Sequence, residues 1–150
     1  MLFTFEGHPP SDNSLYMNMR GKGRVLTPKA REYKHALEEQ VRGQIKQQDR
    51  CGHDYTKQIT ALKDNGLVVN IILRGNWFTK AEAYKKKDVQ NYSKALLDSA
   101  FNVFKEINTA LDDCQIVLLM MAKANDENKL GDQTELSIEL LTMELEDEPE

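Results

Sequence analysis

The sequence predicts a single α+β domain in which two main helices pack on one mixed β-sheet, in the order β-α-β-α-β-β. Three observations lead to this expectation. Residues 67–73 are β-branched and nearly all apolar, which is typical of a central strand. Residues 28–48 and 90–107 each carry one apolar stripe at helical spacing. With 150 residues, the chain can bury one ordinary core without disulfide or metal cross-links.

The first part of the chain is predicted to hold one strand, two loops and one long helix. Residues 2–6 alternate and are rich in Phe, as in a short strand. Residues 11–26 contain Asn, Gly and basic side chains and favour an ordered loop. Thr27 as N-cap and Pro28 at the first helical position predict a helix that runs to about residue 48. The polar segment 49–65 favours a second loop. The apolar stripe of the helix consists of Tyr33, Leu37, Val41 and Ile45.

After the central strand, a polar connection at 74–87 leads to the second helix. Its core stripe consists of Leu97, Ala100, Phe101 and Phe104. An apolar strand is expected at 115–123, then a turn at 124–132 and an alternating last strand at 134–145. Residues 117–121 are expected to pack in the core, although the run is long enough to contribute to an interface between two copies.

Charge is unevenly distributed along the chain. The net charge is −4, but residues 132–150 hold eight acidic residues and no Lys or Arg, so residues 1–131 carry a net charge of +4. Residues 146–150 are acidic and contain a Pro, so we expect a disordered tail after a domain of residues 1–145. Basic side chains cluster at 20–24 and 80–87. Each cluster is either a solvated loop or part of a phosphate-binding surface.

No membrane partner is expected, because the longest strongly apolar run, residues 116–122, is far shorter than the ~20 residues of a membrane helix. The first residues lack the basic and apolar regions of a secretory signal, so a cytoplasmic location is expected. Cys51 and Cys114 are then most simply two reduced thiols. A zinc site built from Cys51, His53 and Cys114 is disfavoured, since no paired ligand spacing accompanies it.

Two polar features point to chemistry. Asn91, Lys94 and Asp98 fall on one face of the second predicted helix, away from its core stripe. The simpler explanation is a Lys94–Asp98 ion pair at i, i+4. Asp112 and Asp113 directly precede an apolar strand, and adjacent carboxylates there either need a compensating cation or form an ordinary turn. A hard cation such as Mg²⁺ prefers such oxygen ligands.

Three sequence blocks stand in order between residues 3 and 123. The first contains Pro9-Pro10-Ser11, Asn13, Tyr16, Arg20-Gly21-Lys22-Gly23-Arg24 and Tyr33. The second is Lys85-Lys86-Lys87, then Asp88-Val89-Gln90-Asn91-Tyr92-Ser93-Lys94, then Ala95-Leu96-Leu97-Asp98. The third is Asp112-Asp113-Cys114-Gln115-Ile116. Together they resemble the RusA-type Holliday junction resolvases, found mainly in bacteriophages and prophages.

The resemblance implies a Mg²⁺-dependent endodeoxyribonuclease, with Mn²⁺ as a substitute metal and no small-molecule cofactor. Such enzymes act as homodimers on branched DNA in recombination, repair or phage DNA processing, and they place one symmetric nick in each of two strands of a four-way junction. The pattern assigns catalytic roles to Asp88, Lys94 and Asp113. Candidate metal ligands are Asp88, Asp113, Asp112, Gln90 and Asp98. Candidate DNA contacts are Asn13, Arg20, Lys22, Arg24, Lys85, Lys86, Lys87 and Asn91.

One position departs from the family pattern: Gln90 stands where a second Asp is expected. A Gln keeps an oxygen ligand but loses the charge, which should lower metal affinity. Three interpretations are open. Asp98 or Asp112 supplies the missing charge, or the enzyme works with fewer acidic ligands and needs more metal. In the third, the chain is a catalytically weakened or inactive protein that binds branched DNA.

Overall fold

Four strands form the main sheet, in the order β1 (Leu2–Glu6), β6 (Gln133–Leu140), β4 (Leu67–Gly75) and β5 (Ile116–Asn125). The computed structural model describes residues 1–62, 65–78, 81 and 88–141. β4 pairs in parallel with β5 and antiparallel with β6, which pairs antiparallel with β1. The sheet is therefore mixed, with β4 inside it, as predicted. Lys85, Lys86, Lys87 and the expected tail at 146–150 lie outside the described residues.

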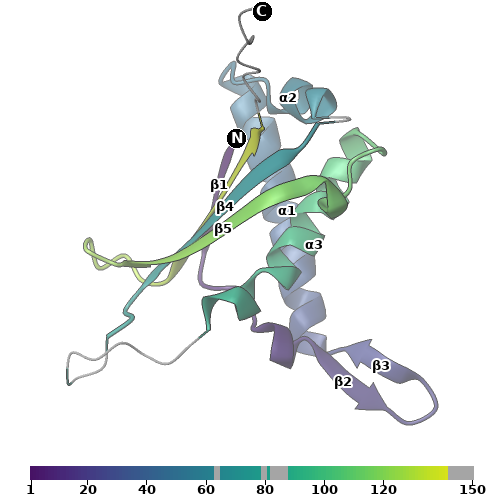
Figure 1. The fold of residues 1–150 in the computed structure, drawn as a ribbon, viewed down its shortest axis with the longest axis vertical. Helices are drawn as coiled ribbons and strands as arrows, with labels where there is room; N and C mark the ends of the chain where they lie inside the picture. The colour runs from purple at the N-terminus through teal and green to yellow at the C-terminus, as the bar shows by residue number, and fades with distance from the viewer. Residues whose placement is uncertain (63–64, 79–80, 82–87, 142–150) are drawn as a thin grey trace, which may run out of the picture.

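Two long helices, α1 (Pro28–Arg50) and α3 (Lys94–Ile107), cover one face of the sheet (Figure 1). The predicted start of α1 is confirmed, because the Thr27 hydroxyl accepts a hydrogen bond from the backbone N–H of Ala30 at 3.2 Å. Both predicted stripes pack in the core, except that Tyr33 is only partly buried. Every second residue of β4 is buried in the same core: Leu67, Val69, Ile71 and Leu73.

Two predicted loops contain regular structure. Residues 11–26 form a 3₁₀ turn, Asp12–Ser14, and a separate hairpin of β2 (Tyr16–Met19) and β3 (Gly23–Leu26). Gly21 and Gly23 adopt positive φ angles of 76° and 71°, which lets the chain reverse tightly between the strands. The polar segment contains α2 (Tyr55–Ala61), which buries only Tyr55 and Ile59. A helix with so few apolar residues gives little periodic signal.

Other boundaries also differ from the prediction. α3 begins at Lys94, because residues 89–92 form a 3₁₀ turn rather than the first helical turn. β6 ends at Leu140 among the described residues. No helix in the described ranges is long and apolar enough to cross a membrane.

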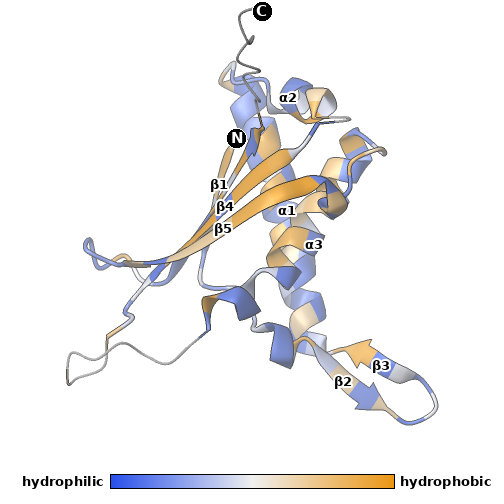
Figure 2. Cartoon of the chain, viewed as in Figure 1, coloured by the Kyte–Doolittle hydropathy of each residue, from blue (hydrophilic) through white to orange (hydrophobic). Residues whose placement is uncertain are grey.

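The prediction for residues 117–121 as core is wrong for most of the run. Val117, Leu118, Leu119 and Met120 are 57, 45, 40 and 48 % exposed, and we call these four residues the β5 patch. β5 is an edge strand, so it has a neighbour on one side only. Figure 2 shows that β4 and β5 are hydrophobic along most of their length, while the helices lie behind them. The strand is apolar but only half covered.

Candidate active site

The start of α3 is held by a segment far away in the sequence. Ser93 precedes the helix without capping it through its side chain. Instead, an Asp12 carboxylate oxygen accepts a hydrogen bond from the backbone N–H of Lys94 at 3.3 Å. Partial burial is the main cause that raises the pKa of Asp12. The 3₁₀ turn at 12–14 therefore fixes the backbone from which the candidate catalytic lysine projects.

Asp98 lies between two ammonium groups. Lys94 Nζ is 3.8 Å from Asp98 Oδ2, which confirms the predicted i, i+4 pair. Lys34, from α1, places its Nζ 3.8 Å from the same oxygen. Asn91 belongs to the preceding 3₁₀ turn, so only Lys94 and Asp98 share the predicted helix face. Sequence reasoning missed Lys34, because its contact depends on how α1 packs against α3.

Asp112 and Asp113 stand at the start of β5. Asp112 caps a 3₁₀ turn by accepting from the backbone N–H of Cys114 at 3.2 Å, and it also accepts from Lys105 Nζ at 3.2 Å. A hydrogen bond between the two carboxyl groups raises the pKa of Asp113 and lowers that of Asp112. Burial and the charges of Asp112 and Asp98 also raise the pKa of Asp113. Asp98 therefore interacts with Lys34 and Lys94 on one side, and its charge also acts on Asp113.

Asp88 caps its own 3₁₀ turn by accepting from the backbone N–H of Gln90 at 3.0 Å. The side chain of Gln90 lies beside β5, in a hollow that Leu119 and Met121 also line. The described ranges contain no group of three or more His, Cys, Asp or Glu side chains arranged to hold a metal, including the zinc candidates. The donors nevertheless suit a hard cation, because they are all oxygens and the charges of Asp112 and Asp98 act on Asp113, with only Lys105 acting against them.

The candidate DNA contacts of the first block lie on the 3₁₀ turn and the hairpin, which projects from the domain near the start of α1 (Figure 1). All four side chains are exposed: Asn13, Arg20, Lys22 and Arg24. The Arg24 guanidinium stacks 4.6 Å from the centre of the Tyr16 ring, which steadies it on the hairpin. Because Asp12 bonds to Lys94, this basic surface is connected directly to the start of α3.

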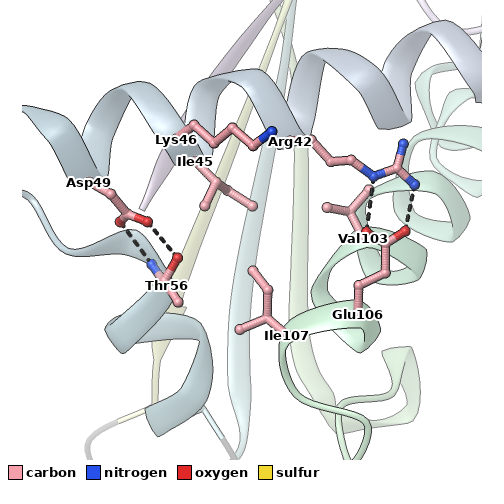
Figure 3. A pocket seen from close by; sticks show the side chains of 8 residues that line it. All are labelled: Arg42, Ile45, Lys46, Asp49, Thr56, Val103, Glu106 and Ile107. Atoms are coloured by element: carbon pink, nitrogen blue, oxygen red, sulfur yellow. Dashed lines mark hydrogen bonds and ion pairs between the residues drawn. The ribbon is translucent and has the colours of Figure 1, made fainter.

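A separate hollow lies between α1, α2 and α3, and none of the predicted site residues lines it (Figure 3). Ile45, Val103 and Ile107 contribute apolar side chains to it. Arg42 closes one side by donating to Glu106 at 2.9 Å, and Asp49 bonds to Thr56 on the other side. Ion pairs and hydrogen bonds within the protein thus occupy most polar groups of this hollow.

Comparison with known proteins gives one family. The model of that family, described as Endodeoxyribonuclease RusA, matches residues 6–139, which include all three sequence blocks. No curated protein matches the chain.

Proposed function

The chain belongs to the RusA family of endodeoxyribonucleases, and on this basis we propose that it resolves four-way DNA junctions. It is a nuclease, and the proposed reaction places one symmetric nick in each of two strands. One observation of the structure supports this most: Asp12, from the segment that carries the basic hairpin, bonds to the backbone of Lys94. A surface suited to DNA phosphates is therefore joined to the candidate catalytic helix.

The basic hairpin would bind the DNA backbone. Arg20, Lys22 and Arg24 are exposed cations that can neutralise phosphates, and Asn13 and Asn91 add hydrogen-bonding amides. Lys85, Lys86 and Lys87 remain candidate DNA contacts on the sequence pattern alone. Such contacts release condensed counterions, so junction binding should weaken steeply as salt increases.

At the scissile phosphate, the proposed reaction is attack of water on phosphorus with departure of a sugar oxygen. Lys94 would place its ammonium beside the phosphate oxygens, where negative charge increases in the transition state. Asp98 holds that ammonium from one side, and Asp12 fixes its backbone. Asp12 is a positioning residue in this scheme, whereas Asp98 both holds the lysine and is a further candidate metal ligand.

Asp88 and Asp113 would be the principal ligands of Mg²⁺, with Asp112, Gln90 and Asp98 as further oxygen donors. The bound ion would neutralise phosphate charge and make the attacking water more acidic. Asp112 already bonds to Lys105 and to its own turn, so it is less free to bind a metal than Asp113.

A second candidate function is junction binding without cutting. The observation in its favour is Gln90, an exposed neutral amide where the family pattern has a carboxylate. One fewer charged ligand lowers affinity for a hard cation.

An end-labelled synthetic four-way junction separates these functions. The protein is incubated with it in Mg²⁺, Mn²⁺ or EDTA, and the products are resolved on denaturing and native gels. Paired symmetric nicks that need metal are the expected result. A retarded junction band without nicks in either metal supports the binding protein. If the junction is neither nicked nor retarded, both proposed functions are contradicted.

We further propose that the active form is a homodimer built across the β5 patch. Four consecutive exposed apolar residues on an edge strand are unusual in a monomer, because an open edge invites pairing with another strand. Residues 116–122 carry no charge, so a two-fold axis there would bring no like charges together. β5 begins three residues after Asp113, so this pairing would fix the two active sites relative to one another.

Leu118→Glu tests this interface, since it would place two carboxylates at the contact. Light scattering after size exclusion should show a dimer for the wild type and a monomer for the variant. Leu130→Glu is the matched control, because Leu130 is 69 % exposed in the turn before β6 and should not affect the dimer. A monomeric wild type, or a dimer that survives Leu118→Glu, contradicts the proposal.

A further inference from the structure

Lys34 lies in the candidate site although it belongs to none of the three sequence blocks. It projects from α1 toward Asp98, and its side chain is 20 % exposed. Lys94 is 48 % exposed and Asp98 is 27 % exposed. All three side chains thus keep access to solvent, and therefore to a ligand that approaches the start of α3.

Both ammonium groups are held loosely. Each Nζ is 3.8 Å from Asp98 Oδ2, which is longer than the roughly 2.7–2.9 Å of a charge-assisted hydrogen bond. Within the described ranges, neither ammonium donates a hydrogen bond to another residue. Their N–H donors are therefore available to an acceptor, such as a phosphate oxygen, that comes within hydrogen-bond distance.

The distances of the two lysines from Asp98 allow both to reach one phosphate group. Because both nitrogens are 3.8 Å from the same oxygen, they are at most twice that distance apart. Two ammonium groups that bind different oxygens of one phosphate stand about 5–8 Å apart, given usual hydrogen-bond lengths. Within the described ranges, Asp98 is the carboxylate that both ammonium groups share. The charge of Asp12 also acts on Lys94, but Asp12 accepts its hydrogen bond from the Lys94 backbone and not from the ammonium.

We propose that Lys34 is a second phosphate-binding residue of this site. It binds the same phosphodiester group as Lys94, while Asp98 keeps the two lysines together. The proposal rests on the proposed function, because it takes DNA as the ligand. The competing explanation is that Lys34 only ties α1 to α3. A tight tie between these helices already exists, however, in the bidentate pair of Arg42 with Glu106.

Lys34→Met tests the proposal, because it removes the charge and keeps much of the side-chain length. Junction binding is measured in EDTA over a range of salt concentrations. The slope of log K against log salt should become shallower by about 0.9 for each lysine lost, and binding at low salt should weaken several-fold. Lys46→Met is the matched control on α1. Lys46 is exposed and lines the separate hollow, so its loss should leave the slope unchanged.

Lys34→Arg keeps the charge and should retain the wild-type slope, which separates loss of charge from damage to the fold. An unchanged slope for Lys34→Met overturns the proposal, especially if the thermal midpoint falls, since that is the signature of a helix tie. Cleavage in Mg²⁺ is assayed in parallel. A wild type that binds junctions but never cuts them contradicts the proposed nuclease reaction, while the salt slopes still decide the role of Lys34.

Discussion

Two charged bridges join α1 to α3, and they differ in how completely their groups are bonded. Lys34 meets Asp98, and eight residues further along both helices Arg42 meets Glu106. Arg42 donates two hydrogen bonds to Glu106 in a fork, and it also bonds to Glu39. Asp98 instead faces two ammonium groups at 3.8 Å without a direct hydrogen bond.

The choice of cation explains the difference. A guanidinium matches the two oxygens of a carboxylate, so one Arg can satisfy one Glu. An ammonium is a point charge that turns readily to another acceptor. The hydrogen bonds from Arg42 are the main cause that lowers the pKa of Glu106. The bridge beside the basic hairpin is therefore open to a ligand, whereas the bridge beside α2 is closed by its own contacts.

Of the changes considered, removing Lys94 from the open bridge, which Asp98 forms with Lys34 and Lys94, should have the largest effect on cutting. Lys94→Ala removes the ammonium that would stabilise charge at the phosphate, so cutting should fall at least about 100-fold. Junction affinity should change by no more than a few-fold, because the proposed binding surface holds several other exposed cations. Single-turnover cleavage and anisotropy titration in EDTA measure the two quantities. Equal loss of both would show that Lys94 is a binding residue only.

Adding a carboxylate near the open bridge should have an intermediate effect. Gln90→Asp restores the charge that the family pattern has at this position, so the Mg²⁺ concentration for half-maximal cutting should fall several-fold. A metal titration of the cleavage rate checks this. Gln47→Asp, at an exposed position on α1, adds the same charge elsewhere and should not change the titration. An unchanged metal dependence for Gln90→Asp would mean that position 90 is not a ligand.

Breaking the closed bridge should have the smallest effect. An exposed ion pair typically contributes about 0–1 kcal/mol, so Arg42→Ala should lower the thermal midpoint by at most a few degrees. Cutting and junction affinity should stay at the wild-type level. Calorimetry and the gel assay together test this. A loss of cutting without a change in stability would show that the two bridges do not differ in function.

Much of the fold follows from local patterns. The β-branched run of β4, the two helical stripes and the Thr27-Pro28 start all act over short stretches of chain, where periodicity and capping decide the structure. The β2–β3 hairpin and α2 were missed for a related reason. Each is short and polar, and each is stabilised by pairing or packing rather than by a strong pattern of its own.

The candidate site likewise has features that local patterns predict and contacts that they do not. Local order and spacing predict Lys94 and Asp98 on one helix face and the Asp112–Asp113 pair at the start of a strand. The contacts of Asp12 with the Lys94 backbone and of Lys34 with Asp98 span 82 and 64 residues of sequence, and they come from the packing of separate elements. The same packing also left the β5 patch exposed. Contacts between distant segments, and the coverage of a strand at the sheet edge, depend on how whole elements pack, and no short pattern encodes that packing.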